Sequence, residues 1–459
     1  MKKFLAAALL AALPTLSHAQ AVYPAPSAYQ RAIAAGYKAM FLCDGLFIAG
    51  RTDTQVESLE LTGIYPEYER IMPTLRATID RPRGMISVPF VDNLPPRRAE
   101  WRKGRGCVLM PIGAPLPSLA EPREAPPPVA GADLRAWPMG DTTGVIRVAG
   151  PVATQLARAF DGETFGKGTR TTAVVIVRDG RIIAERYADG FGPYVAQRTW
   201  SVAKSITGTL AGIAEGEGLL RVNQPAQIPF WRYEPGYDPR RRITLDNLLR
   251  MASGLHTTTV GNRSDDVYFG GGTVDGGPSS ELIEAAPGSR FNYANNDIML
   301  AMLSIRTAIG EERYRDFPNS ALFAKLDMKH TVAGTDWRGN YILSSQIWTT
   351  ARDLARLGLF WLSDGVWRGT RILPQNWMRY ATTPSGPQPL RGPRYGATFW
   401  LIDGISGLPP GSFAAIGNRG QFVMMIPSHR IVIVRRGEDP FTANFDGARL
   451  AAEILAALK

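Results

Sequence analysis

Two β-hairpin patterns, one early and one late in the chain, most constrain how this sequence folds. The first pairs the apolar residues 173–177 with residues 182–184 across the turn Asp179-Gly180, and the second pairs residues 422–427 with residues 431–435. Helical spacing predicts helices over residues 201–220, 244–251, 296–309, 351–362 and 443–458. Hairpins at both ends with helices between them favour an α+β fold. We expect an antiparallel sheet flanked by helices, with an all-helical region, rather than a doubly wound parallel sheet.

Residues 1–19 have the three parts of a secretory signal peptide. A lysine pair gives a positive start, residues 5–13 form a short apolar stretch, and Ser17-His18-Ala19 supplies a small-x-small cleavage site. The stretch is too short to span a bilayer. We therefore expect a periplasmic or secreted protein with no stable membrane anchor.

Residues 20–110 predict a small N-terminal extension on the main body. Residues 27–42 have helical spacing with Ser27 as a possible cap, and residues 85–90 form a β-like run. Cys43 and Cys107 are the only cysteines. In an oxidising compartment an even pair predicts one disulfide, although two unrelated buried thiols would give the same count.

A proline-rich stretch over residues 111–141 predicts an extended linker, and the main domain follows over residues 142–459. At 459 residues the chain is too long for one ordinary core, which suggests two domains or one large domain with an appendage. We find no internal repeat.

The net charge of +11 could suggest a nucleic-acid partner. The arginines are scattered and no basic stretch alternates with aromatic residues, so we expect no nucleic-acid binding. The arginine bias makes one residue conspicuous. Lys204 is the only lysine between Lys167 and Lys325, and lysine can give up its proton where arginine cannot.

Ser201 and Lys204 form the only Ser-x-x-Lys of the chain, at the start of a predicted helix. Positions three apart share one helix face, so the spacing places a hydroxyl beside an amine. Serine is a poor nucleophile until a base takes its proton, and a partly buried lysine can be that base. The alternative is that Ser201 is only a helix cap.

Tyr293 and Asn295 form the only Tyr-x-Asn, directly before a second predicted helix. A loop tyrosine can relay a proton to a leaving group, and an asparagine two residues later can orient the lysine or bind a substrate carbonyl. Tyr293 could instead be a core tyrosine with a bonded hydroxyl.

Ser-x-x-Lys followed by Tyr-x-Asn resembles the serine β-lactamase and penicillin-binding family, in its class C and esterase branch. Residues 243–255 and 351–358 are similar to two further segments of that branch, and the resemblance covers residues 142–459. Within the family the likeness is greatest to the 6-aminohexanoate-dimer hydrolases. The resemblance implies that Ser201 is the acylated nucleophile, that Lys204 and Tyr293 share proton transfer, and that Asn295 completes the second motif.

The family's third motif, Lys-Thr-Gly, has no full counterpart here. The matching place is residues 417–421, Gly-Asn-Arg-Gly-Gln, and it keeps glycine but lacks the lysine and threonine. By analogy, the backbone N–H groups of Ser201 and Gln421 would form the oxyanion hole, with Gly420 allowing close approach. The missing lysine favours the esterase and amidase branch over a true β-lactamase. Arg419 is either a partner for a substrate carboxylate or a surface residue.

The glycine-rich residues 257–277 predict either a mobile lid over the acyl pocket or a plain surface loop. Asp266 and Tyr268 would give this lid polar and aromatic contacts. Trp348 and Trp400 could line the pocket, although core packing is the default for both. No Gly-x-Ser-x-Gly elbow, metal-ligand spacing or phosphate-binding loop occurs.

These patterns predict an exported serine hydrolase that cleaves a small ester or amide through an acyl-enzyme, with no metal or other cofactor. The alternatives are a peptidoglycan-related D-amino-acid peptidase or carboxypeptidase, a weak β-lactamase, and an inactive sensor of the penicillin-binding type. The oligomeric state cannot be derived from the sequence.

Overall fold

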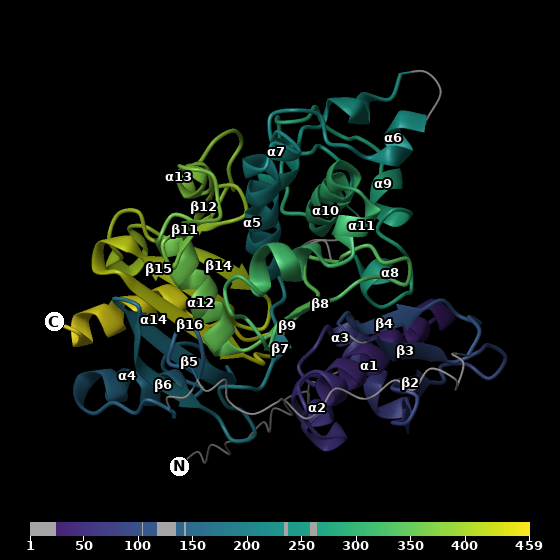
Figure 1. Cartoon of the computed structure of the whole chain (residues 1–459). Coiled ribbons are helices and arrows are strands. Elements are labelled where there is room, and N and C mark those ends of the chain that lie inside the picture. Colours follow the sequence, from purple (N-terminus) through teal and green to yellow (C-terminus); the bar gives the residue numbers. More distant parts are fainter. Residues whose placement is uncertain (1–23, 103, 117–134, 142–143, 234–236, 258–263) are drawn as a thin grey trace, which may run out of the picture.

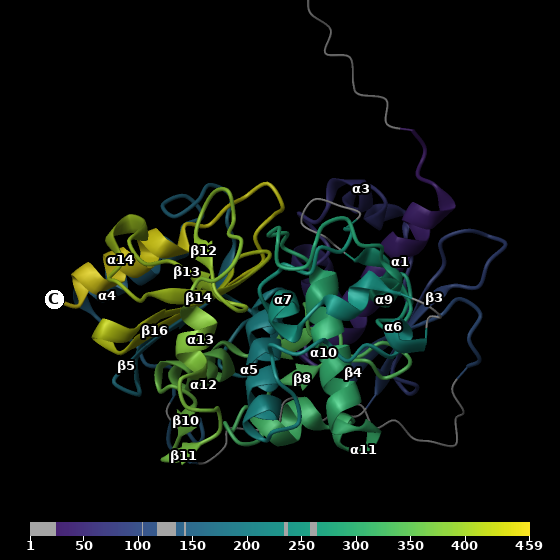
Figure 2. The ribbon, with the colours of Figure 1, turned by 90° about the horizontal axis from the view of Figure 1, so that it is seen from above.

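The computed structural model describes residues 24–102, 104–116, 135–141, 144–233, 237–257 and 264–459. The predicted signal peptide and the middle of the predicted linker lie outside these residues. Figures 1 and 2 show a β-sheet on one side of the molecule, with a helical region and the N-terminal region on the other. The predicted α+β class is confirmed.

The main sheet has seven antiparallel strands in the order β12-β13-β14-β15-β16-β5-β6. The strands are β5 (Thr171–Arg178), β6 (Arg181–Tyr187), β12 (Arg394–Tyr395), β13 (Trp400–Leu401), β14 (Phe413–Gly417), β15 (Gln421–Ile426) and β16 (Ile431–Gly437). Both predicted hairpins are present. In the first, Arg178 pairs with Arg181 across Asp179 and Gly180, whose φ angles of 52° and 78° fit a two-residue hairpin turn.

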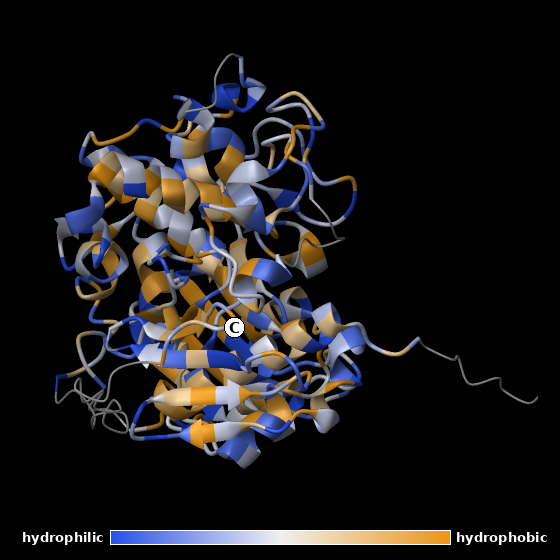
Figure 3. Ribbon diagram, turned by 90° about the vertical axis from the view of Figure 1, so that its right-hand side faces the viewer, coloured by the Kyte–Doolittle hydropathy of each residue, from blue (hydrophilic) through white to orange (hydrophobic). Residues whose placement is uncertain are grey.

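Both faces of this sheet are buried because apolar side chains alternate between two cores. In β5, Val174 and Ile176 pack with α4 (Gly150–Ala159) and α14 (Gly447–Ala457). Val175 and Val177 point the other way, into the larger core that contains the central helices. Figure 3 shows the same concentration of apolar residues along the strands.

The central helices begin and end close to their predicted bounds, with two exceptions, and the helix predicted over residues 27–42 continues to Phe47. The central helices are α5 (Val202–Gly216), α7 (Leu245–Leu249), α10 (Asn295–Ile309) and α12 (Ala351–Leu362). Helix α5 stops at Gly216 instead of residue 220, where Gly218 has a φ of 75° that favours glycine. Helix α14 starts at Gly447 instead of residue 443, because the Asp446 side chain caps it by accepting the Arg449 N–H.

The main body is completed by shorter elements. Its helices and small strands are α6 (Pro229–Tyr233), α8 (Asp265–Tyr268), α9 (Gly277–Ser280), α11 (Glu311–Tyr314), α13 (Trp377–Thr382), β7 (Gln197–Arg198), β8 (Val332–Ala333), β9 (Ile347–Thr349), β10 (Val366–Trp367) and β11 (Thr370–Arg371). Strands β7, β9 and β8 form a separate small sheet, and β7 leads directly into the turn before α5.

The N-terminal region packs one long helix on a four-stranded antiparallel sheet. Its elements are α1 (Ala28–Phe47), α2 (Asp53–Leu59), α3 (Pro66–Glu69), β1 (Thr78–Asp80), β2 (Met85–Val88), β3 (Arg97–Arg102) and β4 (Gly106–Met110). Ser27 caps α1 in a capping box with Gln30, as the sequence predicts. A disulfide joins Cys43 on α1 to Cys107 on β4.

Replacing both cysteines with alanine should lower the free energy of unfolding. The disulfide closes a loop with a sequence separation of 64, and the chain-entropy model gives about 4 kcal/mol for a loop of that size. Guanidinium titration of the oxidised wild type and of the double variant measures the difference. Equal unfolding midpoints and slopes would mean that the crosslink contributes nothing.

The N-terminal region is docked tightly on the main body. At Gly36 on α1, an added Cβ would lie 1.9 Å from the Phe269 carbonyl oxygen. The Tyr68 hydroxyl donates a 2.5 Å hydrogen bond to Asp265, and the Phe441 N–H bonds to Gly63 O at 2.7 Å. At the end of the predicted linker, buried Asp141 pairs with Arg356 on α12 at 2.9 Å.

None of the helices in the described part of the chain is both long and apolar enough to cross a bilayer.

Candidate active site

The site begins at a strained turn between β7 and α5. Trp200 has a φ of 49°, which is unusual for a bulky residue. Ser201 follows at the N-cap position of α5, yet its side chain makes no capping hydrogen bond. This geometry removes the interpretation of Ser201 as a mere helix cap and leaves its hydroxyl facing the site.

Lys204 is 1% exposed and lies at hydrogen-bond distance from three groups. Its Nζ is 2.9 Å from Ser201 Oγ, 2.5 Å from Asn295 Oδ1 and 2.9 Å from the Ser344 carbonyl oxygen. The last two oxygens can only accept a hydrogen bond. A neutral amine donates to them and keeps its lone pair for the Ser201 O–H, which is the arrangement that a general base needs.

The surroundings of Lys204 favour this neutral form. Burial lowers the pKa of Lys204 from 10.5 to about 7, and the Arg198 guanidinium adds to the shift. Among the ion pairs of the described residues, none supplies a carboxylate to Lys204.

Tyr293 lies beside the serine and the lysine. Its ring centroid is 5.1 Å from Lys204 Nζ, and the ring packs against Trp400 at 5.4 Å and edge-on to Tyr395 at 6.0 Å. Burial raises the pKa of Tyr293 to about 12, and hydrogen bonding to Ser201 opposes this shift. The phenol therefore holds its proton near neutral pH while Lys204 can lose one. This separation favours Lys204 as the base and Tyr293 as the proton donor.

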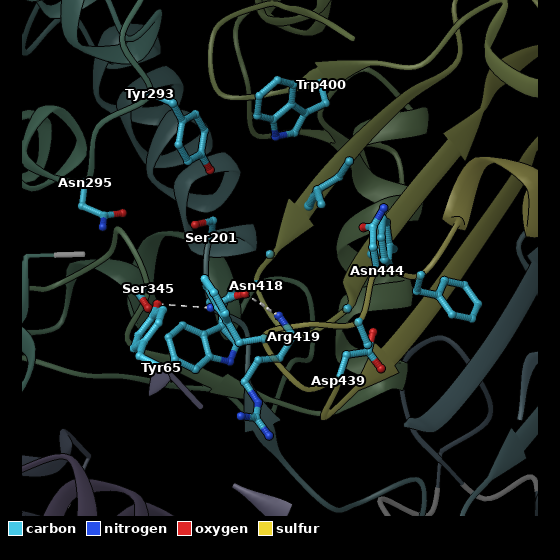
Figure 4. A pocket seen from close by; sticks show the side chains of 18 of the residues that line it. Tyr65, Ser201, Tyr293, Asn295, Ser345, Trp400, Asn418, Arg419, Asp439 and Asn444 are labelled. Carbon is cyan, nitrogen blue, oxygen red and sulfur yellow. Dashed lines mark hydrogen bonds between the residues drawn. The ribbon is translucent and has the colours of Figure 1, made fainter. Parts of the chain in front are cut away.

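The turn between β14 and β15 passes directly beside Ser201 (Figure 4). An added Cβ on Gly417 would lie 2.4 Å from Thr199 O and 3.0 Å from Ser201 N, so only glycine allows this approach. Asn418 and Gly420 also line the cavity at Ser201, whereas Gln421 does not. The buried Gln421 side chain bonds to the carbonyl oxygens of Arg419 and Gly437 instead.

Arg419 lines the cavity, as predicted, but its guanidinium is turned to protein groups and it is not a surface residue. It is buried, with a φ of 55°, and its Nε donates a 3.0 Å bond to Glu438. Its terminal nitrogens donate to the carbonyl oxygens of Leu59 and Thr62 at the end of α2. Arg419 is therefore a structural link to the N-terminal region, and its guanidinium is engaged by protein groups.

The cavity at Ser201 has a volume of about 950 Å³, and eight of its 22 lining residues are aromatic. The N-terminal region supplies one wall through Tyr65, Pro66 and Glu67. The Tyr65 hydroxyl accepts a 3.2 Å hydrogen bond from the Asn418 side chain, close to Ser201 in Figure 4. Trp400 lines the cavity, as the sequence suggested, whereas Trp348 is buried away from it.

The predicted lid is described only in part, because residues 258–263 lie outside the described residues. Tyr268 lines the cavity, and its hydroxyl is 2.6 Å from Ser344 Oγ. Asp266 points elsewhere and accepts a 2.8 Å hydrogen bond from Tyr29 on α1. A movement of this loop stays a prediction.

Three groups of cavity residues were missed at the level of sequence. They are Tyr65, Pro66 and Glu67 at the start of α3, Ser345 before β9, and Phe441, Ala443, Asn444 and Phe445 before α14. None belongs to a motif with chemical spacing, and each reaches the site through long-range packing. The strained Trp200 was also missed, although its place directly before Ser201 could have suggested a role.

Comparison with known proteins identifies the class to which this fold and site belong. The family model described as Beta-lactamase matches residues 155–455, so the chain belongs to the beta-lactamase family of serine hydrolases.

Individual relatives are distant. The 6-aminohexanoate-dimer hydrolase of Paenarthrobacter ureafaciens is 26% identical over 313 residues, which are 61% of this chain and 76% of that protein. A Bacillus anthracis structure, provisionally named a 6-aminohexanoate-dimer hydrolase, is 22% identical with a TM-score of 0.53, covering 63% of this chain and 78% of its own. A class C beta-lactamase is 14% identical with a TM-score of 0.51, covering 67% and 96%. Both of these solved structures share the fold of this chain.

Proposed function

We propose that this chain is an exported hydrolase that cleaves a small ester or amide through an acyl-enzyme on Ser201. The observation that carries the proposal is the buried Lys204 amine, 2.9 Å from Ser201 Oγ and bonded otherwise only to neutral oxygens. The relative named 6-aminohexanoate-dimer hydrolase favours a linear amide as the substrate.

The proposed reaction has two halves. Lys204 takes the Ser201 proton while Oγ attacks the substrate carbonyl carbon, and the Tyr293 hydroxyl then protonates the departing alcohol or amine. Lys204 returns its proton to Tyr293. In the second half, water attacks the carbonyl carbon of the acyl-enzyme and gives a proton to the pair Lys204 and Tyr293. The bond to Ser201 Oγ then breaks, Oγ takes a proton from the same pair, and the acid leaves.

The developing oxyanion needs two donors, and Ser201 N–H is the first. For the second we prefer the main chain at residues 417–418 over Gln421, because Gly417 and Asn418 line the cavity and Gln421 does not.

A substrate carboxylate, as in β-lactams, has no evident partner at this turn. The motif lysine is absent, and the Arg419 guanidinium is engaged by Glu438, Leu59 and Thr62. This favours the ester and amide function over β-lactamase or carboxypeptidase activity.

Assays of nitrophenyl esters, linear amide oligomers and nitrocefin side by side test the proposal. We expect turnover of the first two and little of nitrocefin. Nitrocefin turnover as fast as that of the best ester would support a β-lactamase, and failure of a fluorophosphonate probe to label the protein would support a sensor.

Export is proposed from the signal-like residues 1–19 together with the Cys43–Cys107 disulfide. N-terminal sequencing of the protein from its native host should find a start near Gln20. A protein that begins at Met1 would contradict export by this route.

Activity should rise with pH through about 7, because Lys204 is a base only in its neutral form and its pKa is lowered to about 7. The measurement is kcat/KM for a nitrophenyl ester between pH 5 and pH 9. The acid limb of this profile reports the pKa of the base in the free enzyme. A flat profile below pH 7 would rule out Lys204 as the base.

A further inference from the structure

Arg198 lies on β7, three residues before Ser201, and is 2% exposed. Its guanidinium carbon is 4.0 Å from the Trp200 ring centroid, 5.2 Å from that of Phe41, and 5.4 Å from those of Tyr268 and Phe269. We call these four rings the aromatic cage. Cations bind favourably over aromatic faces, and arginine does so most often.

The cage holds a cation without an ion-pair partner. Among the ion pairs of the described residues, none within 4.0 Å involves Arg198. Its Nη2 donates a 2.7 Å hydrogen bond to Ser345 Oγ, and its Nε a weaker 3.4 Å bond to Ser345 O. Burial of a charge with no carboxylate at ion-pair distance is costly, so a role beyond packing is expected.

Arg198 and Lys204 are connected through two neighbouring residues. Ser344 O accepts the Lys204 amine, and Ser345 accepts the Arg198 guanidinium. The Arg198 guanidinium and the Lys204 amine therefore hold the same turn of chain. Ser345, Trp200 and Tyr268, which contact Arg198, line the cavity at Ser201.

We propose that Arg198 is a positioning residue of the reaction proposed above: a fixed positive charge, held in the aromatic cage, that keeps the Lys204 amine in its uncharged, proton-accepting form. The proposal rests on the proposed function of Ser201 and Lys204.

The electrostatics of the site agree with this role. Burial is the main cause that lowers the pKa of Lys204, and Arg198 is the other. Arginine suits the task because it stays protonated at neutral pH, whereas a second lysine could lose its charge.

The ionisable groups around this pair are few. The groups that interact electrostatically with Arg198 are Tyr37 and Asp44 on α1, Tyr65 directly before α3, and Tyr268 on α8. The Tyr293 ring faces Lys204. Burial raises the pKa of Asp44 to about 7, so that Asp44 compensates Arg198 only in part near neutral pH. On β16, Arg436 donates to the carbonyl oxygens of Gln197 and Arg198, and burial lowers its pKa to about 9.

One ring of the aromatic cage, that of Phe41, belongs to the N-terminal region. Phe41 lies on α1, two residues before the disulfide-bonded Cys43, and Gly36 brings α1 against Phe269. The region that precedes the family domain thus completes the surroundings of the charge that acts on Lys204.

The test compares the pH dependence of fluorophosphonate labelling in the wild type and in Arg198→Met. Loss of a like charge should move the acid limb of the labelling rate upward by about one pH unit. Labelling at pH 6 should then slow roughly tenfold, and the rate should return towards that of the wild type above pH 9. A folded Arg198→Met protein with an unmoved acid limb would overturn the proposal, because a purely structural residue changes stability and not the limb.

Two further variants separate charge from hydrogen bonding and from misfolding. Ser345→Ala removes the main hydrogen bond of Arg198 and keeps the charge, so its limb should stay at the wild-type pH. A shift as large as that of Arg198→Met would contradict a charge effect. If Arg198→Met does not fold, the isosteric Asp44→Asn removes the acid near Arg198. Its acid limb should move to lower pH, because the Arg198 charge is then uncompensated, and an unmoved or raised limb would overturn the proposal.

The outcomes distinguish this inference from the proposed function. A wild type that the probe never labels removes the acyl-enzyme itself. If the wild type is labelled and the pH dependence of labelling is the same in Arg198→Met, only the proposed role of Arg198 is contradicted.

Discussion

Replacing Ser201 with alanine should abolish labelling by a fluorophosphonate probe and lower the rate of ester hydrolysis by roughly 10⁴-fold or more. The same change should leave the thermal unfolding temperature almost unaltered, because the Ser201 side chain makes no capping hydrogen bond on α5. Intact-mass measurement after probe treatment and calorimetry give the two readouts. Loss of folding in this variant would mark Ser201 as structural.

Ser205, one turn further along the same helix, provides the matched control. Its buried hydroxyl donates a 2.5 Å hydrogen bond to the Thr398 carbonyl oxygen, away from the reacting groups. Ser205→Ala should cost about 1–3 kcal/mol of stability, since that carbonyl loses its partner, and should keep labelling at Ser201. The two variants thus have opposite effects on stability and on activity.

Changing Lys204 to methionine should reduce ester hydrolysis by roughly 10²–10⁴-fold, the usual contribution of a general base. Lys204→Arg should be equally inactive, because a guanidinium cannot accept the Ser201 proton. It should also be less stable than Lys204→Met, since it would bury a permanent charge among neutral oxygens. Substantial activity in Lys204→Arg would rule out the lysine as the base.

Lys204 also predicts a pH dependence of stability. The folded lysine loses its proton near pH 7, whereas the unfolded lysine keeps it up to its ordinary pKa of 10.5. Between these values the unfolded chain binds more protons, so raising the pH stabilises the folded form. The free energy of unfolding of the wild type should therefore rise relative to that of Lys204→Met from about pH 7 to about pH 10. Parallel curves from urea titrations would contradict the lowered pKa.

The sequence predicted the contact between Ser201 and Lys204 because the geometry of that pair is local. Helix spacing alone places Lys204 beside Ser201. The Tyr-x-Asn motif at the start of α10 singled out Tyr293 and Asn295, and the structure places Asn295 at Lys204. The alternating apolar strands likewise determined the sheet, since each face needs its own core. Element ends were less certain, as at α14, where a cap at Asp446 outweighs the apolar pattern.

The contacts that the sequence did not predict lie where side-chain direction depends on distant parts of the chain. Arg419 has a left-handed backbone conformation in a tight turn, and its direction is fixed by carbonyl groups of α2. Tyr65 reaches Asn418 only because the N-terminal region docks on the main body. Neither contact leaves a spacing pattern, so neither was predictable from a single sequence.

The pairing of β5 with β16 has a consequence for how the chain acquires its structure. The first long strand of the family domain, β5, hydrogen-bonds to the last strand, β16, and this pair joins β6 to the rest of the sheet. Contacts between such remote residues form slowly, since the entropy of closing a long loop is lost before the contacts can stabilise the chain. During synthesis the sheet stays in two separate parts until the final strand emerges, and a polypeptide stopped before residue 431 would lack the strand that unites them.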